Sequence, residues 1–337
     1  MAVPPPVLDA SPVVERSLRA YLEGRGELLY RMLEYHLGWR DPQGDSTPTA
    51  PVHPYGSLAV LAGQGLGLPA TAVAVCGAAV ELLAHFHAVH REIQDGTPGS
   101  SERPALWWLW GPAQAINAGD GFHALARLTL VQGMQAQGYS SERLVEALRL
   151  LDTTALALCE GRYEDLQLQE RLEVTVAQCR RIAQSQTGGV VGCALALPAI
   201  LAHRPSEVQN LCQEAGRRLG EGVHYWHDVR RWRRPVSEGV AGPVLNKSKT
   251  LPLALALQRA SVREKRELGV VYMKRVLEPA DIPALTALLE RLGAFTEAES
   301  IAQQAIEDGL RLWTSVTGDR GDTLREAVHY LAHEAPI

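Results

Sequence analysis

The amino-acid sequence predicts an all-α protein whose helices form a bundle. Apolar residues recur three and four positions apart over long stretches, which is the spacing of one helix face. The two-residue alternation of a half-buried strand is nearly absent. The 337 residues can bury a sizeable core, and size alone allows one or two domains.

Four stretches carry the clearest helical periodicity. They are residues 70–95, 141–166, 263–277 and 295–316. Ser140 or Ser141 before Glu142, and Thr296 before Glu299, are residue types that cap helix starts. Segments rich in glycine, proline and serine are expected as loops, namely 40–54, 96–104 and 233–249. None of them is long or charged enough for an interdomain linker.

Composition argues against several classes of protein. A net charge of −5 gives no basic footprint for nucleic acid or for an anionic membrane surface. No GxSxG, P-loop or GxGxxG motif occurs in its proper context, which argues against hydrolase, NTPase and dinucleotide chemistry. The longest apolar runs, around 188–202, contain glycine and proline and fall short of a membrane span. We therefore expect a soluble, cytoplasmic protein with no transmembrane segment.

The cysteines indicate buried thiols in a reducing compartment. They are odd in number, far apart and without CxxC spacing: Cys76, Cys159, Cys179, Cys193 and Cys212. This pattern disfavours disulfides and a structural zinc site. Cys193 has no basic partner near it in the sequence, so we expect an unreactive thiol there.

Titratable side chains gather in the stretch AHFHAVHREIQDG (84–96), inside an otherwise apolar helix. Residues three and four apart lie on one helix face. One face carries His87, His90 and Arg91. A neighbouring stripe carries Glu81, Ala84 or His85, and Glu92. A second expected helix repeats the pattern with Glu221, His224, His227 and Asp228.

The order of these segments resembles the polyprenyl synthetase family, the trans-isoprenyl diphosphate synthases. VELLAHFHAVHREIQDG followed by SERPALWWLWGPAQAINAGD resembles the family's DDxxD helix, RRGxP loop and AINAGD helix. Later segments resemble its GQxxDL, KTxxL, second aspartate-rich and lysine-loop segments: LCEGRYEDLQLQ, QSQTGGVVGCALALPAIL, LGEGVHYWHDVRRW and KSKTLPLALAL. The resemblance implies one isoprenoid-synthase helical domain around a central cavity over 15–335, after an N-terminal tail at 1–14.

The resemblance also implies a chemistry. Family enzymes ionise an allylic diphosphate with magnesium held by two aspartate-rich motifs, because the departing group carries about three negative charges. Here the first motif reads Arg91-Glu92-Ile93-Gln94-Asp95, and His227-Asp228 stands at the paired aspartates of the second. If family activity survives, the catalytic carboxylates are Glu92, Asp95 and Asp228, and the cofactor is Mg²⁺.

The expected substrate contacts are also altered. Val52, His53 and Tyr55 stand where the family has basic residues that grip a diphosphate. The candidates that remain for substrate binding are Phe86, His87, Arg103, Arg162, Lys247 and Lys249. Gln186 replaces the KT lysine, and bulky Phe86 and His87 would admit only a short prenyl chain. Losing several such contacts would cost many orders of magnitude in rate, so we expect that standard head-to-tail condensation is lost.

Three interpretations of the changed interior stay open. In the default one the polar residues pair with one another: Arg91 with Asp228 or Asp95, and His87 with a backbone carbonyl. In the second, the site is repurposed for a diphosphate or another substrate. In the third, imidazoles and carboxylates bind a transition metal such as zinc, iron or manganese. The tentative ligands are His87, His90, Glu92, Asp95, His224, His227 and Asp228.

Two further patterns allow two interpretations each. ALWWLWG (105–111) could be an aromatic wall that stabilises a carbocation, although core or dimer packing is the default. RRWRRP (230–235) reads as a solvated helix end, with capture of phosphate or of a partner's acidic surface as the alternative.

Two classes of function follow. The first is a non-catalytic or regulatory partner subunit of a prenyl diphosphate synthase, as a homodimer or as a heteromer with a synthase paralogue. The alternative is an enzyme that ionises a prenyl diphosphate, either a terpene-synthase-like lyase or an altered short-chain prenyltransferase.

Overall fold

The computed structural model describes residues 3–22, 24–48, 50–100, 102–171, 173–233, 242–274, 277–318 and 322–335. Over these residues the chain is helical, and its only β-structure is two isolated bridges, Arg40 with Ser46 and Gly99 with Pro104. The predicted all-α class is therefore confirmed.

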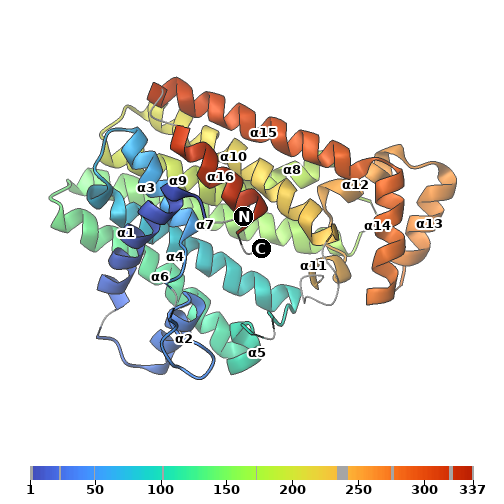
Figure 1. Ribbon diagram of the computed structural model, residues 1–337, viewed down its shortest axis with the longest axis horizontal. Coiled ribbons are helices and arrows are strands. Elements are labelled where there is room, and N and C mark those ends of the chain that lie inside the picture. The colour runs from blue at the N-terminus through green and yellow to red at the C-terminus, as the bar shows by residue number, and fades with distance from the viewer. Residues whose placement is uncertain are drawn as a thin grey trace.

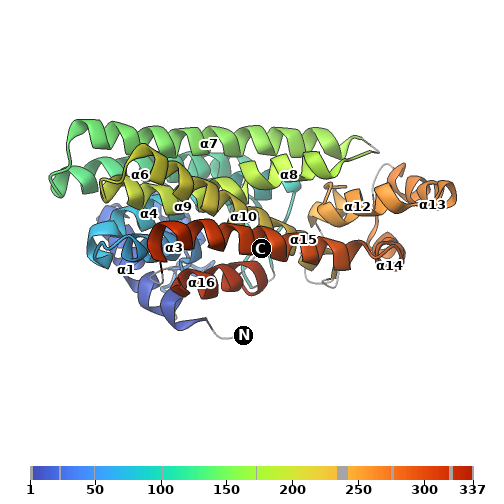
Figure 2. The same ribbon diagram turned by 90° about the horizontal axis from the view of Figure 1, so that it is seen from above.

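The helices follow one another along the chain with short connections. The first eight are α1 (Pro5–Leu22), α2 (Leu28–His36), α3 (Pro54–Gly65), α4 (Ala70–Asp95), α5 (Leu106–Trp110), α6 (Pro112–Ala136), α7 (Ser141–Gln169) and α8 (Val176–Ser185). The others are α9 (Thr187–Leu201), α10 (Ser206–Arg233), α11 (Gly242–Leu245), α12 (Leu251–Arg259), α13 (Val262–Tyr272), the 3₁₀ turn η2 (Pro279–Asp281), α14 (Ile282–Arg291), α15 (Ala294–Thr317) and α16 (Asp322–His333). Figures 1 and 2 show α7 and α15 running along the long axis, with α12 to α14 grouped at one end of the molecule.

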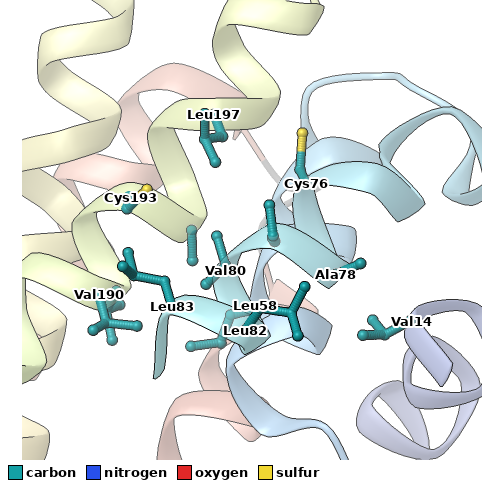
Figure 3. Close-up of a cluster of buried hydrophobic side chains, with 14 of the residues drawn as sticks. Val14, Leu58, Cys76, Ala78, Val80, Leu82, Leu83, Val190, Cys193 and Leu197 are labelled. Atoms are coloured by element: carbon teal, nitrogen blue, oxygen red, sulfur yellow. The ribbon is translucent and has the colours of Figure 1, made fainter. Parts of the chain in front are cut away.

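Helix α4 is the central core element. Its length and apolar composition would be sufficient to cross a membrane. In the structure, however, α3, α6 and α9 pack around it, and it lies in the core. Figure 3 shows Val80 and Leu83 of α4 facing Val190 of α9, with Leu58 of α3 nearby; all four are buried. Burying such side chains contributes about 1.5–3 kcal/mol each. This packing fixes the direction of the titratable faces of α4.

A second apolar cluster holds the other end of the molecule together. It is formed by α8, α10, α12, α14 and α15, with Tyr225, Trp232 and Phe295 almost fully buried in it. Because α10 belongs to both clusters, the second titratable helix is fixed along its whole length.

Several helix boundaries agree with expectation. Helix α4 covers 70–95 as predicted, and the Ser140 hydroxyl caps α7 by accepting from Arg143 N at 3.4 Å. Thr296, however, lies inside α15, which starts after Gly293 in the left-handed conformation (φ 67°). The capping prediction for Thr296 is wrong because glycine can make the sharp entry without a side-chain cap.

The expected N-terminal tail is also corrected. Residues 5–14 form the first half of α1, and Val7, Ala10 and Val14 are buried. Pro5 and Pro6 stand in the first turn, where no helical N–H donor is needed. In the expected loop 233–249, residues 242–245 form α11, and 234–241 lie outside the described residues.

The cysteine prediction holds for four of the five. Cys76, Cys179, Cys193 and Cys212 are buried, and burial raises the pKa of the Cys193 thiol to about 12. Cys159 is exposed on α7, which differs from the expectation.

A close crossing of α9 and α10 positions the second titratable helix. A Cβ atom at Gly220 would lie 2.5 Å from the Thr187 carbonyl oxygen and 2.6 Å from Gly188 Cα. Gly216 makes an equally close approach to Val191 O, at 2.5 Å. The two backbones touch because these positions have no side chain, so the polar face of α10 is held against the start of α9.

We expect Gly220→Ala to destabilise the protein by about 1–3 kcal/mol, because a methyl group there forces the two backbones apart. Gly269→Ala on α13 is the matched control, since nothing lies within 4 Å of its Cβ position. The control should raise the free energy of unfolding by about 0.4–1 kcal/mol. Urea denaturation measures both; equal effects would contradict the close crossing.

Candidate functional site

The ends of α4, α7 and α10 meet around a polar interior. It contains three guanidiniums and three carboxylates from these helices, which we name the arginine–aspartate network: Arg91, Asp95, Arg162, Asp165, Asp228 and Arg231. All of them except Arg91 are buried. The charges of the network sum to zero when each residue is ionised.

Arg162 links α4 to α7. Its Nη2 donates to Asp95 Oδ1 at 2.5 Å and its Nη1 to Asp165 Oδ2 at 2.6 Å. Its Nε donates to Gln94 Oε1 at 2.8 Å. Arg91 Nε donates to the second oxygen of Asp95 at 3.3 Å. Both oxygens of Asp95 therefore contact a guanidinium, and the default pairing of Arg91 with Asp95 is present.

Asp228 is held in the same way on α10. Arg231 Nη1 donates to Asp228 Oδ1 at 3.3 Å, and the Leu251 backbone N–H donates to Oδ2 at 3.0 Å. Burial raises the pKa of Asp228 to about 6 although Arg231 opposes the shift, and burial lowers the pKa of Arg231 to about 10. The Asp228 carboxylate is therefore oriented toward the protein's own donors.

These residues do not fit a magnesium cluster held by both motifs. Magnesium demands near-octahedral oxygen ligands and retains water. The oxygens of Asp95 and Asp228 already accept from guanidiniums or a backbone N–H, and Glu92 lies near His36 instead, with Oε1 at 3.7 Å from Nε2. Cationic nitrogens thus stand beside the carboxylates that a metal would need.

Two of the expected histidines face the network. Burial lowers the pKa of His87 to about 3, Arg91 and Arg162 act in the same direction, and the Gln186 side chain opposes. The pairing of His87 with a backbone carbonyl stays a prediction. His224 Nδ1 lies 3.0 Å from Thr187 Oγ1, and burial lowers its pKa well below the ordinary value.

The other two motif histidines point elsewhere. His90 Nδ1 donates to Phe86 O at 3.0 Å, and its ring occupies the space that a side chain at Gly119 of α6 would need. His227 Nε2 donates to Leu331 O of α16 at 2.8 Å. The expected metal centre shared by the histidines of both helices is therefore corrected, because the His90 ring faces α6, with Nε2 3.4 Å from Asp120 Oδ1, and His227 bonds to α16.

The remaining substrate candidates are tied to neighbouring groups. Lys249 Nζ donates to Lys247 O at 2.9 Å and lies 4.9 Å from the Tyr272 ring centroid; burial lowers its pKa to about 8. Lys247 donates to Lys274 O. Phe86 packs edge-on against the His90 ring, with centroids 5.0 Å apart, and its ring centroid lies 5.2 Å from that of His123 on α6.

The tryptophans of ALWWLWG pack locally. Trp107 Nε1 donates to Thr97 O at 2.7 Å, and Trp110 packs edge-on against Tyr35 with centroids 5.3 Å apart. Trp108 is 62% exposed. None of these contacts involves a residue of the arginine–aspartate network. The tryptophans therefore serve local packing, as the default interpretation expected, and do not form a wall around that interior.

The basic run after α10 is not a uniformly solvated end. Arg231 is buried against Asp228, and Arg230 Nη1 donates to Ala332 O at 3.1 Å. Arg233 pairs with Glu299 of α15. Residues 234 and 235 lie outside the described residues.

The neighbouring stripe of α4 lines a cavity of about 780 Å³. We name it the histidine pocket; it lies between α2, residues 47–55, α4 and residues 103–105. Arg103 and Glu92 line it, and Arg103 stacks over the Tyr35 ring at 4.7 Å. The candidate residues on α4 therefore belong to two separate sites: Glu92 lines the histidine pocket on one face of the helix, and Asp95 belongs to the arginine–aspartate network on another.

The sequence analysis did not predict one cluster in this pocket. His53, Glu81 and His85 bring ligand atoms within 4.8 Å of one another. Glu15 Oε2 lies 2.6 Å from His53 Nε2. Burial opposes a charge on His53, but Glu15 and Glu81 together raise its pKa to about 9. The spacing of Glu81 and His85 was visible in the sequence; the approach of His53 depends on how α3 packs on α4.

Arg162→Ala tests the arginine–aspartate network. It leaves Asp165 without its partner and Asp95 with Arg91 alone, so we expect the free energy of unfolding to fall by about 3–5 kcal/mol. Arg181→Ala is the matched control, because it removes an exposed pair with Glu164 worth at most about 1 kcal/mol. Urea denaturation distinguishes them, and a loss below 1 kcal/mol for Arg162→Ala would contradict the network.

His227 should make stability sensitive to acid. Burial lowers its pKa to about 3, although the hydrogen bond to Leu331 opposes the shift. The unfolded chain protonates near pH 6.5, so this stability is intact above pH 6.5 and is lost as the pH falls toward 3. We expect His227→Gln to show a smaller drop in Tm between pH 7 and pH 5 than the unsubstituted protein. The exposed His329→Gln serves as the control, and an unchanged drop for His227→Gln would refute this role.

Comparisons with known proteins agree with this architecture. The family model described as "Polyprenyl synthetase" matches residues 56–289. A geranylgeranyl diphosphate synthase of Mycobacterium tuberculosis is 29% identical over 309 residues, which cover 89% of this chain and 84% of the relative. A (2E,6E)-farnesyl diphosphate synthase of Mycobacterium bovis is 24% identical over 97% of this chain and 92% of its own length.

Solved structures show the same fold. A polyprenyl synthetase from Streptomyces coelicolor A3(2) superimposes with a TM-score of 0.84 and 22% identity, covering 98% of this chain and 100% of the other. A geranylgeranyl pyrophosphate synthetase from Geoglobus acetivorans gives a TM-score of 0.81 and 21% identity, covering 97% and 99%. The fold is the all-α isoprenoid-synthase fold, and the resemblance seen in the sequence is confirmed. The chain belongs to the polyprenyl synthetase family.

Proposed function

We propose that this chain is a non-catalytic partner subunit of an active prenyl diphosphate synthase. The observation that carries the proposal is the pairing of Asp95 and Asp228 with Arg162, Arg91 and Arg231. These carboxylates are the ones that remain from the two aspartate-rich motifs. In this chain they are partners of arginine.

The leaving group of the family reaction is a diphosphate, which carries about three negative charges. Ionisation of an allylic diphosphate needs uncompensated positive charge in a dry site. The three guanidiniums of the network are balanced by three aspartates, and removing one partner of a buried ion pair costs about 3–5 kcal/mol. A diphosphate would have to compete with Asp95, Asp165 and Asp228 for the same guanidiniums.

An exposed apolar stripe on α7 supports a role as a subunit. Val145, Leu156 and Tyr163 are 63%, 59% and 65% exposed. Their spacings of eleven and seven residues place them on one helix face. Figure 2 shows α7 along the outer edge of the molecule. We take this stripe as the surface that meets a synthase of the same fold.

The alternative is an enzyme that ionises a prenyl diphosphate, as a terpene-synthase-like lyase or an altered short-chain prenyltransferase with Mg²⁺. The relatives named as geranylgeranyl and farnesyl diphosphate synthases favour it. So does Lys249, which is retained beside the network and interacts electrostatically with Asp165. One assay separates the two functions.

The assay incubates the purified protein with Mg²⁺ or Mn²⁺ and geranyl, farnesyl or geranylgeranyl diphosphate, with and without isopentenyl diphosphate. We expect no release of pyrophosphate above the enzyme-free rate, and a stable complex on co-expression with an active synthase paralogue from the same genome. Leu156→Glu together with Tyr163→Glu should break that complex. Val262→Glu is the matched control, because Val262 is 70% exposed on α13 at the far end of the molecule. Pyrophosphate release by the protein alone would refute the proposal and favour the enzyme.

A further inference from the structure

Three potential metal ligands converge at the wall of the histidine pocket. Glu81 and His85 are four residues apart on α4 and so share a face, and His53 immediately precedes α3. Glu81 Oε1 lies 3.8 Å from His53 Nδ1 and 3.6 Å from His85 Nε2. The arrangement therefore points one carboxylate oxygen and two ring nitrogens at a common centre.

We propose that His53, Glu81 and His85 bind one divalent transition-metal ion, and specifically Zn²⁺. Two imidazoles and one carboxylate form a ligand set that zinc uses when it keeps a fourth position open. Zinc–ligand bonds of about 2.0–2.1 Å place tetrahedral ligand atoms about 3.4 Å apart. The two separations that involve Glu81, 3.6 and 3.8 Å, are within a few tenths of an ångström of that value, and all three ligand atoms lie within 4.8 Å of one another.

Each proposed ligand has its other polar atom held by the protein. Glu15 Oε2 lies 2.6 Å from His53 Nε2, and the Gly56 backbone N–H donates to Glu81 Oε2 at 2.6 Å. A carboxylate on the far nitrogen of a histidine ligand is the usual device that fixes the ring and its tautomer. His53 Nδ1 and Glu81 Oε1 thereby face the centre, and Zn²⁺ bound there takes the place of a proton on Nδ1.

His85 is oriented by a second histidine. Its Nδ1 lies 2.7 Å from His36 Nδ1, and His36 Nε2 lies 3.7 Å from Glu92 Oε1. If His85 donates through Nδ1, the Nε2 lone pair faces Glu81 and His36 presents its own N–H to Glu92. Glu92, a catalytic candidate in the sequence, then supports this cluster instead of the arginine–aspartate network.

Charge and access also suit a cation. Glu81 is buried, with 3% of its surface exposed. Glu15 also forms an ion pair with Arg19, in which Arg19 Nε lies 2.5 Å from Glu15 Oε1. The open side of the cluster faces the cavity of about 780 Å³, in which Glu92 Oε2 is buried and has no hydrogen-bond partner. A water molecule or an anionic oxygen of a ligand in the cavity would complete the coordination.

The test is zinc binding by the chelator-stripped full-length protein, measured by competition with a chromophoric chelator and by elemental analysis. We expect one Zn²⁺ per chain, and a cobalt-substituted protein with the visible absorption of a four-coordinate site. His85→Gln and Glu81→Gln should weaken binding by more than about 100-fold, and Glu15→Gln by about 10–100-fold. Circular dichroism of each variant verifies that it is folded.

A surface histidine pair provides the matched control. His329 and His333 lie one turn apart on α16 with ring centroids 4.3 Å apart, and could bind zinc adventitiously. The double variant His329→Gln/His333→Gln should retain full zinc binding. Loss of zinc in this variant, normal binding in folded His85→Gln and Glu81→Gln, or no stoichiometric zinc in the unsubstituted protein would each overturn the proposal. Because the readout is metal content, the result is independent of whether the chain is a partner subunit.

Discussion

The ion pair between Arg162 and Asp95 is the interaction on which the account of this protein depends. It ties the end of α4 to α7 and places a guanidinium against the last acidic residue of the first motif. Arg91 takes the second oxygen of that carboxylate, and Arg231 takes Asp228 on the facing helix. If these residues occupy the metal positions that the resemblance implies, as the proposed function holds, a fixed positive charge of the protein stands where family chemistry would require an exchangeable one.

Much of the fold could be predicted from local patterns. Helix α4 follows from an apolar pattern with a period near 3.6, and α7 from its serine cap, because both depend on neighbours along the chain. The first half of α1 was not predicted, because the family resemblance begins near residue 15 and the burial of Val7 and Ala10 depends on packing with other helices. The start of α15 was missed since a glycine entry leaves no capping signature.

The site was predictable only up to the faces of each helix. Spacing separated the two stripes of α4, and they do line two different sites. Spacing could not tell that the His90 ring faces Gly119 and Asp120 of α6 or that His227 meets a carbonyl of α16, because these neighbours come from other parts of the chain. The cluster of His53 with Glu81 and His85 was hidden for the same reason: it forms where the start of α3 meets α4.

The central claim is that this interior cannot hold divalent ions together with a diphosphate. The most direct measurement is a crystal structure of the protein soaked with Mn²⁺ and a bisphosphonate, with the anomalous signal locating the metal. The account predicts intact Arg162–Asp95 and Arg231–Asp228 pairs and no manganese on either carboxylate. Manganese ions coordinated by Asp95 and Asp228 and bridged by the bisphosphonate would contradict it.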